Sequence, residues 1–241
     1  MNKKVQLSHR LQAVVNLVTP GYSVADIGCD HAYISIYMVQ EGIAGKVIAM
    51  DVNRGPLERA KENIEKYGYL EQIETRLSDG IQALNGGEVH TLLIAGMGGP
   101  LMQQILRGNP SVVEQVEELV LQPQSEISEV RRFVEALGFQ ILEEEMLMED
   151  GKYYTMFRAE RVPKVVPWGS ELFYRYGKEL LEKKNSCLRK YLEREKEKCR
   201  NIRNAIEQNP SPKGLEKLRV LEEDITYCEE ALAYYECRTD Y

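Results

Sequence analysis

Short apolar runs alternate with helical patterns over residues 1–165. Candidate strands are Val24–Ile27, Val47–Met50, Ile73–Leu77, Leu92–Ala95 and Leu119–Leu121, and ranges with helical spacing lie at 7–18, 32–41, 56–67, 99–107 and 126–137. Runs such as Leu92–Ala95 are continuously apolar, which is typical of strands buried on both faces. The alternation predicts an α/β fold with a Rossmann-like, mostly parallel sheet.

The end of this region has a different pattern. Two strand-like runs flank Asp150-Gly151 within residues 139–160. An Asp-Gly pair between such runs is a strong signal for a β-hairpin, because both residues tolerate the positive φ of a tight turn. The sheet is therefore predicted to end in an antiparallel hairpin.

Beyond Pro163 and Pro167 glycines become sparse and charges dense. Mostly apolar positions with 4-3 spacing run from Leu181 to Ile206 and again from Leu218 to Tyr235, separated by the turn sequence NPSPKG at 209–214. This spacing predicts two helices that fold back as an antiparallel coiled-coil hairpin. We expect an α/β domain over 1–165 and a helical domain over 166–241.

The two predicted long helices carry opposite charge. Residues 169–208 contain 11 Lys/Arg and 7 Asp/Glu, a net of +4, whereas residues 209–241 contain 4 and 8, a net of −4. The charges could serve only to pair the helices. Alternatively, the first helix presents a basic face to RNA phosphates, formed by Lys183, Lys184, Arg189, Lys190, Arg194, Lys198 and Arg203.

Composition restricts the class of protein and its expected location in the cell. The 241 residues carry a formal net charge of −7, which argues against a strongly basic nucleic-acid binder but leaves room for a local basic face. No apolar run is long enough for a membrane span, and no secretory signal is recognisable. The five cysteines lack Cys-x-x-Cys spacing. We expect a cytoplasmic protein without a metal, and a monomer.

Acidic residues end three successive candidate strands: Asp26, Asp51 and Asp79. Ligands of open parallel sheets bind beyond the carboxyl ends of the strands, where Asp51 could accept both ribose hydroxyls of an adenosine and Asp79 its amino group. Each aspartate could instead only cap the following helix.

The loop after the first strand decides between adenosine cofactors. A nicotinamide fold would need Gly-x-Gly-x-x-Gly to admit the pyrophosphate. This loop has one glycine, Gly28, and places Asp30 where a diphosphate would approach. Carboxylates repel phosphate and suit the cationic S-adenosylmethionine, which we favour as the cofactor. A nicotinamide oxidoreductase and a non-catalytic RNA-binding module remain the alternatives.

The fourth strand ends in Ile94–Pro100, with glycines at 96, 98 and 99. These glycines could form a platform for a flat base or only a tight turn. Gln122 and Gln124 follow the fifth strand at the same edge, and their amides could contact a base.

Together these segments resemble a known family. The sequences "HRL" (9–11), "VADIGCDHAYI" (24–34), "AMDVNRGPLERAKENI" (49–64), "SDG" (78–80), "IAGMGG" (94–99), "LQPQ" (121–124) and "EDGKYY" (149–154) resemble the bacterial tRNA (adenine-N1)-methyltransferases that modify adenine 22. Gln124 departs from the asparagine usual there. The resemblance implies a class I methyltransferase that acts on tRNA and has a helical hairpin.

The predicted site follows from the strand ends and this resemblance. The cofactor site comprises Asp26, Gly28, Cys29, Asp30, Asp51, Val52, Asp79, Gly80, Ala95 and Gly96. Asp30, His31, Tyr33, Gly96 and Met97 are expected to position the acceptor adenine, since its N1 has a lone pair and needs no general base. Arg10, on the first helix, is expected to contact RNA.

Overall fold

The computed structural model describes residues 4–236, so Cys237 lies outside the described part of the chain. Two compact units divide the chain. The sheet unit comprises residues 1–145 and 154–167, and the helical unit comprises residues 146–153 and 168–241. The tip of the predicted hairpin thus joins the helical unit, because Met146 is buried in the apolar cluster of those helices. The structure therefore differs from the predicted single boundary at residue 165, because residues 146–153 belong to the helical unit.

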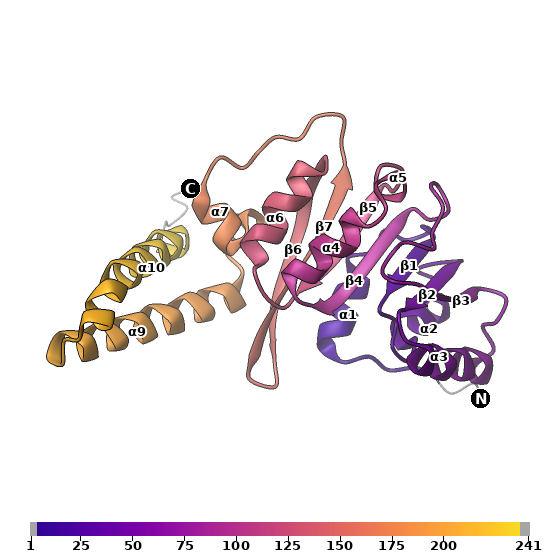
Figure 1. Ribbon diagram of the computed structural model, residues 1–241, viewed down its shortest axis with the longest axis horizontal. Helices are drawn as coiled ribbons and strands as arrows, with labels where there is room; N and C mark the ends of the chain where they lie inside the picture. The colour runs from indigo at the N-terminus through magenta and orange to yellow at the C-terminus, as the bar shows by residue number, and fades with distance from the viewer. Residues whose placement is uncertain (1–3, 237–241) are drawn as a thin grey trace. The chain divides into compact units, whose positions relative to one another are not determined.

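Seven strands of the described chain form one sheet in the order β3-β2-β1-β4-β5-β7-β6 (Figure 1). The parallel strands are β1 (Val24–Ile27), β2 (Val47–Asp51), β3 (Ile73–Leu77), β4 (Thr91–Met97) and β5 (Glu118–Pro123), and the hairpin strands are β6 (Phe139–Glu149) and β7 (Lys152–Arg161). β7 pairs antiparallel with β5. The predicted α/β class, with its antiparallel end, is confirmed.

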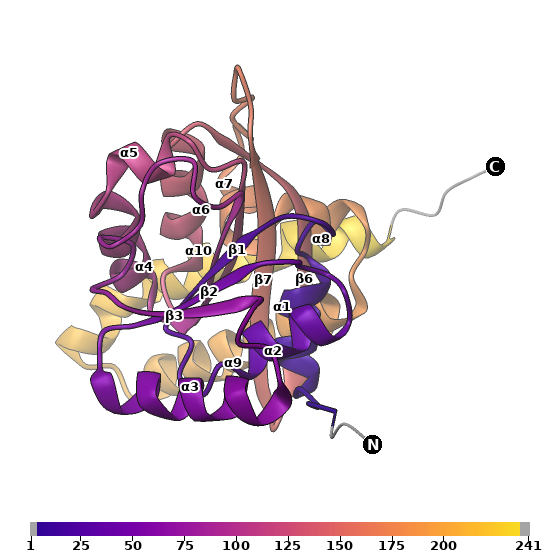
Figure 2. The ribbon, with the colours of Figure 1, turned by 90° about the vertical axis from the view of Figure 1, so that its right-hand side faces the viewer.

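Helices cover both faces of the parallel strands. Figure 2 shows α1 (His9–Asn16), α2 (Tyr33–Gln40) and α3 (Arg54–Tyr67) on one face and α4 (Gly99–Arg107), α5 (Pro110–Val113) and α6 (Ile127–Ala136) on the other. All four residues of β1 are buried, as expected for a strand between two helical layers. β1 lies between β2 and β4, where the strand order reverses, so a ligand site is expected beyond its carboxyl end.

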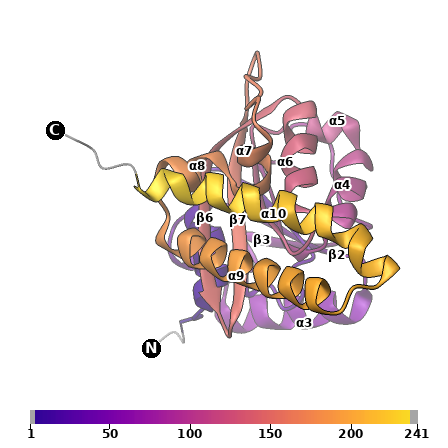
Figure 3. The same cartoon turned by 90° about the vertical axis from the view of Figure 1, so that its left-hand side faces the viewer.

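The helical unit contains α7 (Glu171–Tyr176), α8 (Lys178–Glu182), α9 (Ser186–Gln208) and α10 (Pro212–Glu236). α9 and α10 pack side by side (Figure 3), and the buried side chains along them include Leu188, Leu192, Cys199, Ile225, Cys228 and Leu232. The prediction of one helical repeat from Leu181 was wrong. Asn185 caps α9 by accepting hydrogen bonds from the N–H groups of Cys187 and Leu188, and the chain therefore breaks between α8 and α9.

Candidate active site

Asp26, the third residue of β1, carries a buried carboxyl group with a side-chain partner. The residue is only 2% exposed, and the Ser35 hydroxyl donates a 2.6 Å hydrogen bond to its Oδ2. Burial raises the pKa of Asp26 to about 6, against the opposing effect of the Ser35 hydrogen bonds. The carboxyl group therefore changes charge close to neutral pH, at the edge where a ligand is expected.

The loop after Asp26 bends sharply. Gly28, Asp30 and Ala32 have φ values of +77°, +48° and +58°, a left-handed conformation that costs non-glycine residues about 1–3 kcal/mol each. The φ of Gly28 favours glycine there, and a Cβ would in addition lie 2.3 Å from Cε at the flexible end of the Met97 side chain. The N–H groups of Gly28 and Cys29 both donate to the Met50 carbonyl, which holds the bend against β2.

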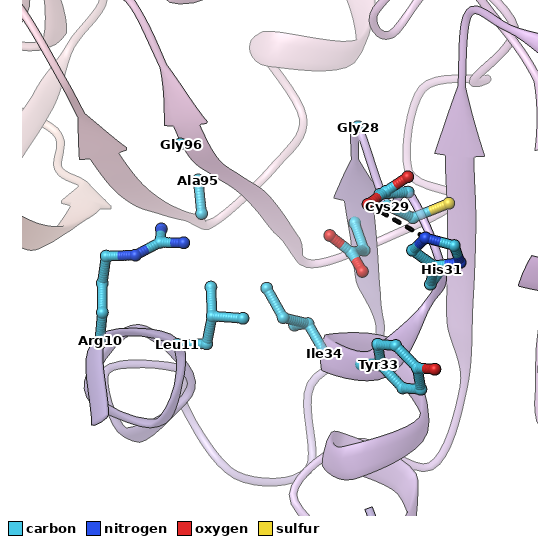
Figure 4. A pocket seen from close by; sticks show the side chains of 11 residues that line it. Arg10, Leu11, Gly28, Cys29, His31, Tyr33, Ile34, Ala95 and Gly96 are labelled. Carbon is cyan, nitrogen blue, oxygen red and sulfur yellow. Dashed lines mark ion pairs between the residues drawn. The ribbon is translucent and has the colours of Figure 1, made fainter. Parts of the chain in front are cut away.

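A cavity of about 210 Å³ opens beside this loop (Figure 4). Arg10 and Leu11 of α1 face the loop and the end of β4 across it. Its lining residues are Arg10, Leu11, Asp26, Gly28, Cys29, Asp30, His31, Tyr33, Ile34, Ala95 and Gly96. The cavity thus brings a guanidinium group and two carboxyl groups together in one small space.

Arg10 is oriented by two residues from distant parts of the sheet unit. Its Nη1 donates a 2.7 Å hydrogen bond to Oε1 of the buried Gln122, and its guanidinium lies 5.2 Å from the ring centroid of Tyr154. Tyr154 comes from the antiparallel strand β7, whose contribution the sequence did not indicate. The position of Arg10 on the cavity separates it from the other predicted RNA-binding residues, which belong to the helical unit.

A second cavity, of about 420 Å³, lies along the ends of β1 to β4. Its lining residues are Ile27, Gly28, Asp30, Met50, Asp51, Val52, Asn53, Pro56, Ser78, Asp79, Gly80, Ala95, Gly96, Met97, Leu101 and Ile105. The two cavities share Gly28, Asp30, Ala95 and Gly96. An elongated ligand that spans both cavities would meet carboxyl groups in each, and the apolar side chains of Leu101 and Ile105 in the second.

Asp51 has a role other than capping α3. Its Oδ1 accepts a 2.8 Å hydrogen bond from the Asn53 N–H, while α3 begins at Arg54 without a side-chain cap. Asp79 caps none of the helices in the described chain. The capping explanation therefore fails for both residues, and their carboxylates are available to a ligand in the second cavity.

His31 and Tyr33 form an exposed aromatic pair at the first cavity. Their ring centroids are 5.8 Å apart with an interplanar angle of 30°, and the His31 Nε2 lies 3.7 Å from Asp30 Oδ2. The Tyr33 residue is 42% exposed. Asn63 holds the loop from below by donating to the His31 carbonyl. The pair offers a flat surface and a nearby carboxylate to a second ligand.

The comparison with known proteins matches this geometry. Residues 7–157 match a protein family described as a methyltransferase domain. The chain belongs to this methyltransferase family. It is 36% identical over 157 residues to the tRNA (adenine(22)-N(1))-methyltransferase of Bacillus subtilis, an alignment that covers 65% of this chain and 66% of the relative.

Solved structures extend the similarity to the helical unit. The B. subtilis m1A22 tRNA methyltransferase TrmK superposes with a TM-score of 0.82 at 30% identity, covering 95% of this chain and 99% of that one. TrmK of M. capricolum, solved with S-adenosyl-homocysteine, has a TM-score of 0.82 at 28% identity, covering 95% and 98%. The predicted TrmK-like, S-adenosylmethionine-dependent class I methyltransferase is confirmed, and the nicotinamide alternative finds no support.

The predicted site residues of the methyltransferase divide between the cavities. Asp30 and Gly96 line both cavities, His31 and Tyr33 line the first, and Met97 lines the second. All ten predicted cofactor residues line at least one of them. Sequence reasoning missed the apolar walls Leu11, Ile34, Leu101 and Ile105, because helix residues that face a cavity show the same periodicity as core residues.

The three glycines at the end of β4 and the start of α4 differ in role. Gly96 has a φ of +80° and lines both cavities. At Gly99 a Cβ would lie 2.5 Å from the Ser125 carbonyl oxygen, and at Gly98 it would lie 3.2 Å from the Ser125 hydroxyl. Gly98 and Gly99 therefore allow α4 to approach the loop after β5, whereas Gly96 lines the two cavities described above.

The thiol of Cys29 at the site is unreactive, and no group of metal ligands is found among the described residues. Burial raises the pKa of the Cys29 thiol, and the carboxylates of Asp26 and Asp51 raise it further, so the group stays protonated and is a poor nucleophile. Within residues 4–236 no group of three or more His, Cys, Asp or Glu side chains could hold a metal ion. Over the same range no helix is long and apolar enough to cross a membrane.

Proposed function

We propose that this methyltransferase transfers the methyl group of S-adenosylmethionine to N1 of adenine 22 in tRNA. The observation that carries the proposal is the pair of adjoining cavities, which share lining residues, with carboxyl groups in both and a guanidinium group in the first. The named activity of the B. subtilis relative supports the choice of tRNA and of the position.

The lining residues suit the parts of the cofactor. In the first cavity Asp26 would pair with the ammonium group and Arg10 with the carboxylate of the methionyl part. In the second cavity Asp51 would accept the ribose hydroxyls and Asp79 the adenine amino group, between the apolar side chains of Leu101 and Ile105. When bound, the cofactor supplies a methyl group on a positively charged sulfur.

The acceptor adenine is positioned by Asp30, His31, Tyr33, Gly96 and Met97 in this proposal. The exposed rings of His31 and Tyr33 give the base a stacking surface. The lone pair of adenine N1 forms the new bond to carbon while sulfur keeps the pair of the bond that breaks. The ring thereby becomes cationic, and the Asp30 carboxylate stabilises that charge. Orientation, which can contribute about 7–11 kcal/mol, supplies the rate without a general base.

We also propose that the helical unit contacts the tRNA through its basic residues. Six of the predicted contacts lie on or next to α9: Lys183, Arg189, Lys190, Arg194, Lys198 and Arg203. Lys184, the seventh, has a φ of +52° in the break before α9. A cytoplasmic location and a monomeric state complete the proposal.

Methyl transfer to defined RNA tests this function. Purified protein and labelled S-adenosylmethionine are incubated with an unmodified tRNA transcript, with the same transcript carrying guanine at position 22, and with a DNA oligonucleotide. We expect 1-methyladenosine, identified by mass spectrometry, only in the first. A protein that binds S-adenosylhomocysteine but methylates no tRNA would refute the proposal, and binding of RNA without any transfer would favour a non-catalytic module.

A further inference from the structure

The cations of α9 are not equivalent. Three of them are paired with glutamates one helical turn away: Arg189 with Glu193 at 3.0 Å, Lys198 with Glu195 at 2.9 Å and Arg203 with Glu207 at 3.7 Å. Lys183, just before the helix, is paired with Glu179 of α8 at 3.2 Å. Such pairs locally neutralise the helix surface. Lys190 and Arg194, by contrast, are exposed and have no carboxylate partner among residues 4–236.

Lys190 and Arg194 lie where α9 meets the tip of the β-hairpin. Tyr153, from that tip, packs edge-on against Tyr191 of α9 with ring centroids 5.2 Å apart. The Arg194 guanidinium lies 5.8 Å from the centroid of the Tyr153 ring. Lys190 is one turn before Arg194 on the same face of the helix. The tip adds Lys152, which is exposed and has no ion pair within the described chain.

We propose that Lys152, Tyr153, Lys190 and Arg194 form the main RNA-binding surface of the helical unit, here called the hairpin-tip surface. Unpaired cations held beside an aromatic ring suit a phosphodiester backbone, because a guanidinium stacked on a ring still directs its N–H groups outward. The exposed side chain of Met148, a residue 56% exposed, adds an apolar contact for a base at the same tip.

The hairpin-tip surface is adjacent in sequence to a residue of the candidate active site. Tyr154 follows Tyr153 directly, belongs to the sheet unit and lies against Arg10 at the first cavity. RNA bound at the hairpin tip is thus held by residues that are contiguous in sequence with the active site. This inference rests on the proposed tRNA substrate and narrows the basic face of α9 to the end that meets the hairpin.

Two triple variants with the same change of charge test the proposal. The first, Lys152→Ala/Lys190→Ala/Arg194→Ala, removes the unpaired cations of the hairpin-tip surface, and the second, Lys183→Ala/Arg189→Ala/Lys198→Ala, removes paired ones. Binding of unmodified tRNA is measured against salt concentration. We expect the first variant to lose affinity at least ~10-fold and to lower the salt slope by about 2, since each lost phosphate contact removes about 0.7–0.9 from that slope. The second should lower the slope by less than about 1.

Affinity for S-adenosylhomocysteine and the thermal midpoint should stay at the wild-type values in both variants, because every substituted side chain is exposed. Equal loss of tRNA affinity in the two variants, or unchanged affinity in the first, would overturn the hairpin-tip surface. If the wild-type protein methylates tRNA in that case, the proposed function stands and only this inference fails. A wild-type protein that neither binds nor methylates tRNA would refute both.

Discussion

Arg10 and Gln122 lie 112 positions apart and meet at the active site through a 2.7 Å hydrogen bond from Nη1 to Oε1. Gln122 is fully buried, and its Nε2 donates to the Pro123 carbonyl, so its oxygen can only face Arg10. The guanidinium group is therefore oriented at the first cavity before any ligand arrives.

Arg10→Ala is expected to weaken binding of S-adenosylhomocysteine by about 10- to 100-fold, because a hydrogen-bonded ion pair to the methionyl carboxylate contributes about 1.5–3 kcal/mol. Binding of 5′-methylthioadenosine, which lacks that carboxylate, should not change. Calorimetric titration with both ligands measures the difference, with the exposed Lys46→Ala as control. Equal losses for the two ligands would mean that Arg10 acts on the fold of the cavity and not on the carboxylate.

The raised pKa of Asp26 predicts that cofactor binding depends on pH. Its pKa in the folded protein is about 6, so affinity for the ammonium-bearing ligand should fall as pH decreases through 6 and the carboxylate is protonated. Titration of S-adenosylhomocysteine between pH 5 and pH 8 follows this change. In Asp26→Asn the affinity should be low throughout, with this step absent. If the affinity of the variant falls with decreasing pH as much as that of the wild type, the titrating group is a residue other than Asp26.

The raised pKa of Asp26 also affects the stability of the ligand-free protein, which should fall as pH rises, whereas cofactor affinity should rise. The folded state binds the Asp26 proton more tightly than the unfolded state, whose value is 3.8. Stability is therefore lost as pH rises from about 4 to about 6, by up to ~3 kcal/mol for a shift of this size. Asp26→Asn should unfold at higher denaturant concentration than wild type at pH 7.5, and at similar concentration near pH 4.

Asp51→Ala should reduce affinity for S-adenosylhomocysteine by more than ~1 kcal/mol, the scale for losing hydrogen bonds to a charged group. The substitution also removes the acceptor of the Asn53 N–H, so Asp51→Asn, whose side-chain oxygen can keep that hydrogen bond, is the matched variant. Calorimetry on both variants separates ligand contact from loop structure. Wild-type affinity in Asp51→Ala would remove this residue from the binding site.

Gly99→Ala should destabilise the protein by about 1–3 kcal/mol, the usual range for forcing extra atoms into a packed site, because the new Cβ would meet the Ser125 carbonyl at 2.5 Å. Gly45→Ala is the control, since a Cβ there has no atom within 4 Å. Urea unfolding measures both free energies. A cost for Gly99→Ala no larger than that of the control would show that α4 can shift away from the loop.

Much of the fold could be read from local periodicity. The continuous apolar runs predicted β1 and β4 because strands covered on both faces have no polar side. The predicted hairpin around Asp150-Gly151 is present as β6 and β7, since the turn chemistry is local. The apolar repeat predicted the start of the long helix too early, at Leu181. The start of α9 is set by the hydrogen-bonded cap at Asn185, which produces no change in hydrophobicity.

The sequence by itself determined that Asp26, Gly28, Asp51, Asp79 and Gly96 would share one edge of the sheet, because parallel strands bring their carboxyl ends together. Only the tertiary structure decided that Arg10 joins them, oriented by Gln122 and Tyr154, since contacts between distant segments leave no periodic trace in the chain. Burial, likewise a tertiary property, set the pKa of Asp26. The folded arrangement also placed Arg194 beside the Tyr153 ring at the hairpin tip, whereas the ion pairs of Arg189, Lys198 and Arg203 join residues three or four positions apart and are local in sequence.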